Sequence, residues 1–213
     1  TIGGIFHRLG FHVPEPTLKP NDSNPRGFYE SWWPVNFHRR LMKRAGIEQT
    51  DGRPIAWQLV SDRVDDRARG QLHDWLADQF EGRRRVVVKD PRAAWVPLLW
   101  ADVAEKVGAD LDYVTMIRHP SEVVGSRWTH YASRSPGLSV RAYTTRQLCG
   151  LINQNLTLEA QTREASRAYV RYADLVSGWR PVLAALIDDL SLGDDLLTGE
   201  AVAAIDAFVE PGL

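Results

Sequence analysis

An arginine and a serine eight positions apart, in the segment YVTMIRHPSEVVGSRW, have the side chains needed to bind a phosphate group together. Arg118 follows an apolar run, and Ser126 lies in a predicted helix that begins at Pro120. A guanidinium presents a planar fork of donors that matches phosphate oxygens, and a serine hydroxyl can join it. An arginine paired with a surface carboxylate, with a serine packed against a sheet, explains the same residues equally well.

A second group of candidates lies in VVVKDPR, where Lys89, Asp90 and Arg92 follow a run of valines. The chain has only four lysines, so a lysine at the end of a predicted strand favours a functional role over a solvent-facing one. Asp90 is a candidate general base. Arg92 could bind substrate or pair with Asp90.

The elements that must position these residues alternate between short strands and helices. The pattern predicts strands at 85–89, 113–117 and 168–172, and helices at about 1–10, 34–45, 66–80, 97–108, 120–133, 139–166, 179–190 and 198–209. This alternation is typical of an α/β fold with a parallel sheet flanked by helices. Such sheets bind ligands at the carboxyl ends of their strands, which is where Lys89, Arg118 and Tyr172 are expected.

The composition excludes several classes of function. The 213 residues are expected to form one domain, and a net charge of −1 gives no overall attraction to nucleic acid or acidic lipid. The single Cys149 excludes an intrachain disulfide and favours a cytoplasmic protein. No apolar run is long enough to cross a membrane, and the six histidines lack metal-ligand spacing.

Several segments, in order along the chain, resemble the PAPS-dependent sulfotransferases of bacterial type, where PAPS is 3′-phosphoadenosine 5′-phosphosulfate. They are IGGIFHRLG, NPRGFYES, VVVKDPR, IRHPSEVVGSRW, VRYADLV and FVEPGL. The resemblance implies a three-layer P-loop NTPase-like fold, PAPS as donor, 3′,5′-ADP as product and no metal. It places Arg118 and Ser126 on the 3′-phosphate and Tyr172 near the adenine, although Ala173 replaces the glutamate of the family pattern.

The same resemblance places the family's phosphosulfate loop immediately before this sequence. The chain begins without methionine inside a helical pattern, so we expect further residues upstream of Thr1, and the chain could also continue beyond Leu213. Thr1 would then lie at or just beyond the last residue of that loop and would contact the nucleotide.

The catalytic base is the least defined part of the predicted site. Some family members carry a histidine two or four positions after the strand-end lysine, but this chain has Pro91 and Ala93 there. Glu30 is our candidate base, since certain carbohydrate-directed members are similar in placing a glutamate nearby. A glutamate that caps the next helix is an equally good interpretation, and Asp90 is the alternative base. Lys89 would stabilise charge on the leaving group.

The acceptor would be a hydroxyl or amine of a small molecule, carbohydrate or lipid. Arg92, Trp33 and Asn155 are candidate acceptor-binding residues, although Trp33 could equally belong to the core. Asn155 is expected on the apolar, buried face of the helix at 139–166, where its amide could instead bond to the backbone. Two rival functions stay open at this point. One is another P-loop transferase such as a kinase, although Arg118 stands where kinases commonly place an acidic metal ligand. The other is a non-catalytic nucleotide-binding module.

Overall fold

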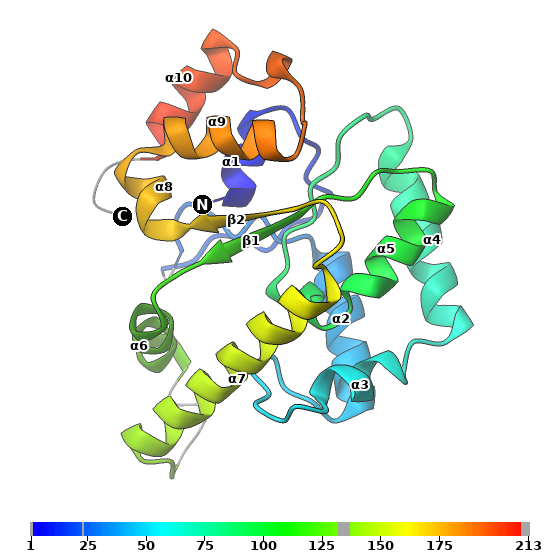
Figure 1. Cartoon of the computed structure of the whole chain (residues 1–213), viewed down its shortest axis with the longest axis vertical. Coiled ribbons are helices and arrows are strands. Elements are labelled where there is room, and N and C mark those ends of the chain that lie inside the picture. Colours follow the sequence, from blue (N-terminus) through cyan, green and yellow to red (C-terminus); the bar gives the residue numbers. More distant parts are fainter. Residues whose placement is uncertain (1, 23, 132–136, 210–213) are drawn as a thin grey trace.

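A computed structural model describes residues 2–22, 24–131 and 137–209 and shows a mostly helical α/β protein with a two-stranded parallel sheet (Figure 1). The α-helices are α1 (Ile2–Arg8), α2 (Trp32–Ala45), α3 (Ala56–Ser61), α4 (Asp66–Phe80), α5 (Pro97–Lys106), α6 (Pro120–Tyr131), α7 (Val140–Gln161), α8 (Tyr172–Ser177), α9 (Trp179–Asp189) and α10 (Gly199–Phe208). Short 3-10 helices are η1 (Pro91–Trp95) and η3 (Asp194–Leu196).

The sheet consists of β1 (Tyr113–Ile117) and β2 (Arg167–Arg171), which pair in parallel from Tyr113↔Arg167 to Ile117↔Arg171. Their β-branched and aromatic residues favour an extended chain between two packed layers. The prediction of a strand at 113–117 is confirmed. The second strand lies one residue earlier than predicted, because Tyr172 already begins α8.

The predicted strand at 85–89 is wrong. Within the described residues this segment makes a single parallel bridge, between His12 and Val86. Two hydrogen bonds form it, from His12 N to Arg85 O and from Val87 N to His12 O, each of 2.9 Å. The valines reflect packing instead, because Val87 contacts one apolar cluster and Val88 contacts the other. An extended segment between two apolar clusters therefore has the composition of a buried strand but lacks the regular backbone hydrogen bonds of a sheet.

Local capping explains where several helices begin. Asp65 accepts a hydrogen bond from Ala68 N at the start of α4, and Ser139 accepts one from Ala142 N at the start of α7. Each satisfies a backbone N–H that has no partner inside the helix.

Two short helices, α3 and α8, were not predicted. Helix α7 is shorter than predicted, because its last turn ends at Gln161 rather than at residue 166.

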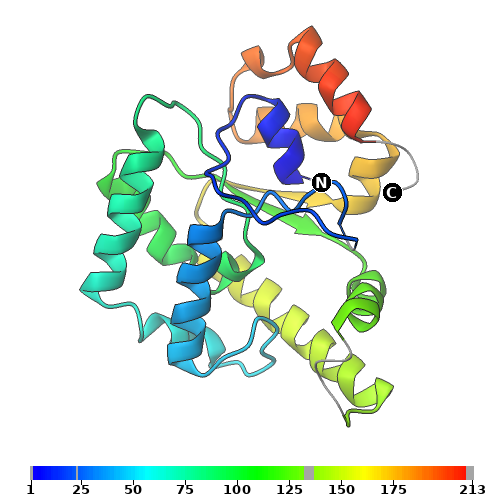
Figure 2. The same cartoon turned by 180° about the vertical axis from the view of Figure 1, so that it is seen from behind.

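Two apolar clusters pack on either side of the strands. One joins α1, α9 and α10 to the β2 residues Ala168 and Val170, and the other joins α2, α4 and α5 around Trp95. Figures 1 and 2 show α1, α9 and α10 together on one side of the strands, with α2, α5 and α7 on the other. Among the described helices, none combines the length and the apolar character that crossing a membrane requires.

Candidate functional site

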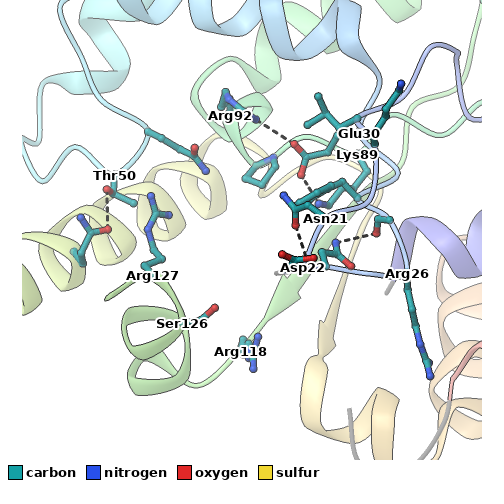
Figure 3. A pocket seen from close by; sticks show the side chains of 18 of the residues that line it. Asn21, Asp22, Arg26, Glu30, Thr50, Lys89, Arg92, Arg118, Ser126 and Arg127 are labelled. Carbon is teal, nitrogen blue, oxygen red and sulfur yellow. Dashed lines mark hydrogen bonds and ion pairs between the residues drawn. The ribbon is translucent and has the colours of Figure 1, made fainter. Parts of the chain in front are cut away.

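An open cavity of about 1710 Å³ lies beyond the carboxyl ends of β1 and β2 and is lined by residues from many separate parts of the chain. Six of the predicted site residues line it: Glu30, Lys89, Arg92, Arg118, Ser126 and Tyr172. In Figure 3, Arg118 and Ser126 enter from the end of β1 and from α6, and Glu30, Lys89 and Arg92 enter from the opposite side, the first two from loops and Arg92 from η1. Thr1, predicted to contact the nucleotide, lies outside the described residues.

Arg118 joins the ends of the two strands. Its Nε donates to Glu122 Oε2 at 2.8 Å, and its guanidinium carbon lies 4.6 Å from the centre of the Tyr172 ring. The ion pair agrees with the structural interpretation of Arg118, but it uses only one of three nitrogens. Among the described residues, the two terminal nitrogens and the exposed Ser126 hydroxyl have no hydrogen-bond partner. These donors are therefore available to an anion in the cavity.

Glu30 is buried between two cations. Its Oε1 accepts from Lys89 Nζ at 2.5 Å, and its Oε2 lies 3.4 Å from the Arg92 guanidinium. The helix-cap interpretation of Glu30 is wrong, because Ser31 occupies the N-cap position of α2 and the Glu30 carboxylate reaches across to Lys89. Only 8% of the Glu30 side chain is exposed, against 31% for Lys89, so the carboxylate meets the cavity through a narrow opening.

Asp90 does not line the cavity but lies beneath it, with a fully buried side chain. Its Oδ1 accepts from the Arg92 guanidinium and from Arg92 N, and its Oδ2 accepts from His38 Nδ1 at 2.7 Å. Trp100 Nε1 donates to His38 Nε2 at 3.0 Å. Because an indole N–H can only donate, His38 is neutral with its proton on Nδ1.

The protonation of Asp90 follows from these partners. Burial would raise the pKa of its carboxyl, but the hydrogen bond from His38 and the charge of Arg92 outweigh burial and lower it. Asp90 is thus an ionised group that holds Arg92 in place. A carboxylate with both oxygens bonded and no access to the cavity is poorly placed to accept a proton from an acceptor.

Trp33 and Asn155 are not brought to the cavity. Trp33 stacks on Phe37 and Trp75, with ring centres 5.0 and 4.7 Å away, which supports its core interpretation. Asn155 is exposed, and its Nδ2 donates to Leu151 O at 2.8 Å. The apolar pattern around Asn155 suggested a buried face of α7, yet Leu156 is 65% exposed. That prediction is wrong, because the packed face of α7 is formed by Tyr143, Gln147 and Gly150.

The charge of the cavity was not evident from the sequence. Although the whole chain has a net charge of −1, the described lining has eight basic and three acidic side chains. The basic ones are Lys19, Arg26, Arg39, Lys89, Arg92, Arg118, Arg127 and Arg146, and the acidic ones are Asp22, Glu30 and Glu48. Such a concentration of one charge in a cleft favours an anionic ligand. Of the residues that the sequence did not single out, His38 lies in no motif, and Arg127 lies within IRHPSEVVGSRW without a role assigned to it.

Comparisons with known proteins give one distant structural similarity. No family model and no curated protein matches the chain. Among solved structures, the chain resembles the sulfotransferase domain from the curacin biosynthetic pathway, with a TM-score of 0.48 and 20% sequence identity. The aligned region covers 79% of this chain and 58% of that domain, so the chain spans little more than half the length of the structure it matches.

Proposed function

We propose that the protein transfers a sulfuryl group from PAPS to a hydroxyl or amine of an acceptor. One observation carries this proposal: the donors Arg118 and Ser126, the ring of Tyr172 and the Lys89–Glu30 pair all line a single cationic cavity at the ends of the strands. We also propose that the fold is a P-loop-like arrangement of three layers, in which helices cover both faces of the sheet. The structure itself describes two strands of that sheet.

The proposed nucleotide site is built from the two strand ends. Arg118 would hold the 3′-phosphate through the guanidinium nitrogens that Glu122 leaves free, and Ser126 would donate its hydroxyl to the same phosphate. Tyr172 would offer an aromatic surface to the adenine, and the Arg118 guanidinium over its ring holds that surface in place. These three residues fit one phosphate group and the base of a nucleotide.

The proposed chemistry uses the Lys89–Glu30 pair. PAPS, when bound, supplies the sulfuryl group and a phosphate leaving group. Glu30 would accept the acceptor's proton as the acceptor oxygen or nitrogen bonds to sulfur, and each Glu30 oxygen keeps a second lone pair for this. The sulfur–oxygen bond to the phosphate breaks, and Lys89 would stabilise the charge that develops on the departing oxygen. Arg92, held by Asp90, would keep the Glu30 carboxylate oriented.

A nucleotide-binding module without transfer activity is the second candidate. The two ion pairs of Glu30 favour it, because they occupy the carboxylate before any acceptor arrives. In that case Lys89, Glu30 and Arg92 form a structural network in the cavity wall.

Transfer of labelled sulfate separates these candidates. The full-length protein is incubated with ³⁵S-labelled PAPS and a panel of phenols, sugars, lipids and amines, and both labelled product and 3′,5′-ADP are measured. The proposal expects equal amounts of the two products with at least one acceptor. Tight binding of 3′,5′-ADP without transfer to any acceptor would favour the binding module, and phosphoryl transfer from ATP with Mg²⁺ would favour a kinase.

A further inference from the structure

Arg127 lines the cavity but is not aligned with the proposed nucleotide site. It follows Ser126 in α6, and in Figure 3 its side chain extends toward Thr50, away from Arg118. Successive residues of a helix point about 100° apart, so Ser126 and Arg127 serve different parts of one cavity. The role of Arg127 must therefore be sought in the part of the cavity wall around Thr50.

Arg127 has no hydrogen-bond or ion-pair partner in the part of the chain that the structure describes. Its Nε is closed off from solvent, and no hydrogen-bond acceptor reaches it among residues 2–22, 24–131 and 137–209. No acceptor among these residues reaches the two terminal nitrogens either, and because Arg127 lines the cavity they are the donors that a ligand there can bind.

The neighbouring side chains are already engaged with one another. Thr50 donates its hydroxyl to Gln147 Oε1 at 3.1 Å, and both side chains are buried. Glu48, the acidic residue on this wall, forms an ion pair with Arg146. Arg39, exposed at the rim, has no ion-pair partner within the described part of the chain. The wall therefore presents unpaired positive charge.

We infer that Arg127 binds a carboxylate of the acceptor, so that the preferred acceptors are acidic molecules that also bear the hydroxyl or amine to be sulfated. A guanidinium fork matches a planar carboxylate with two parallel hydrogen bonds, and the surrounding cationic wall excludes competing amines. That the bound acid is a sulfuryl acceptor rests on the proposed function, but the existence of the anion-binding position is argued from Arg127 and its surroundings alone.

Matched probes test this inference without knowledge of the natural acceptor. Titration calorimetry on the full-length protein saturated with 3′,5′-ADP compares 4-hydroxybenzoate with 4-hydroxybenzamide, and glucuronate with glucose. The acidic member of at least one pair should bind about 10-fold or more tightly, since two charge-assisted bonds are gained. In NMR spectra, the Nε–H signal of Arg127 should shift with the acidic probe and not with its neutral partner.

Variants assign the preference to Arg127. Arg127→Gln should abolish the acid preference, Arg127→Lys should keep part of it, and Arg39→Gln, which removes an equal charge at the rim, should keep most of it. None of the three should lower the melting temperature, because neither Arg127 nor Arg39 has an ion-pair partner to lose among the described residues.

Four results would overturn the inference. They are equal affinity for acidic and neutral probes, no binding of any acidic probe at millimolar concentration, an acid preference that survives Arg127→Gln, and a collapse of thermal stability in both Arg127 variants. Affinity for 3′,5′-ADP is measured separately in every variant. If 3′,5′-ADP fails to bind while hydroxybenzoate still binds through Arg127, the proposed function falls and the anion site remains.

Discussion

Lys89 and Glu30, which are 59 residues apart in the sequence, meet with 2.5 Å between Nζ and Oε1. The pair closes the cavity floor from two loops and joins a buried network through Arg92. For chemistry to occur here, an arriving acceptor must compete with Lys89 for the Glu30 carboxylate. Substitutions at this pair therefore distinguish a catalytic role from a purely structural one.

Glu30→Gln should lower kcat for sulfuryl transfer by about 10²–10⁴-fold, which is the usual contribution of a positioned base. Glutamine keeps the shape of the side chain and can still accept from Lys89, so 3′,5′-ADP should bind as in the native protein. The measurement is steady-state transfer across a range of pH, with nucleotide affinity determined by calorimetry.

Lys89→Met is the matched partner of that variant. It removes the charge that would stabilise the leaving group, so turnover should fall while the pH dependence set by the base remains. A Glu30→Gln protein that retains most of its kcat would contradict the assignment of Glu30. Acceptors acidic enough to react without a base, such as phenols, would then be the natural ones to test.

Asp90→Asn should destabilise the protein by about 3–5 kcal/mol, because it removes the nearer carboxylate partner of the buried Arg92 guanidinium and leaves only Glu30, at 3.4 Å. Asp195→Asn is the control: Asp195 also pairs with an arginine, but its side chain is 71% exposed, so its loss should cost about 1 kcal/mol or less. Urea unfolding at neutral pH measures both. Equal midpoints for the two variants would contradict the network around Asp90.

The lowered pKa of Asp90 also predicts how the free energy of unfolding changes with pH. A carboxyl with a folded-state pKa below its ordinary value of 3.8 adds stability above that value and loses it as pH falls through the folded-state pKa. The difference in unfolding free energy between the native protein and Asp90→Asn should therefore shrink below about pH 4. A difference that stays constant down to pH 2 would show that Asp90 is not ionised in the folded protein.

Gly150→Ala should destabilise by about 1–3 kcal/mol, the usual cost of overpacking. A Cβ at Gly150 would overlap the backbone carbonyl of Thr50 and lie 2.8 Å from its Cα, so α7 must move away from the cavity wall. Gly125→Ala in α6 meets nothing within 4 Å and should stabilise by about 0.5–1 kcal/mol through helix propensity. Thermal unfolding of the two variants should shift in opposite directions; shifts of the same sign would contradict the packing of α7 on Thr50.

The sequence predicted the elements whose signals are local. Strand 113–117 and helix 66–80 were predicted with their bounds, because an apolar run and a helical pattern are each complete within one segment. The strand predicted at 85–89 was wrong because valines record burial and not hydrogen bonding. In α7, an apolar pattern around Asn155 gave no sign of which face would be packed.

The residues of the candidate site likewise divide into those that the sequence predicted and those that it could not. Six predicted residues line one cavity, since strand ends and their flanking loops converge in an α/β fold. The buried chain from Trp100 through His38 to Asp90 could not be predicted, because its members come from three separate elements and form no motif. That Arg127 Nε has no acceptor among the described residues is likewise a property of its surroundings, and no spacing in the sequence encodes it.

The central claim is that Arg118 and Ser126 bind a 3′-phosphate, and calorimetry with two nucleotides tests it most directly. The full-length protein should bind 3′,5′-ADP at least about 10-fold more tightly than 5′-AMP, since each charge-assisted hydrogen bond contributes about 1.5–3 kcal/mol. Arg118→Lys, which keeps the charge but loses the fork, should weaken 3′,5′-ADP by about 1–2 kcal/mol with unchanged melting temperature. Equal affinities for the two nucleotides, or an Arg118→Lys protein that melts early yet binds normally, would contradict the account and leave Arg118 as the ion-pair partner of Glu122.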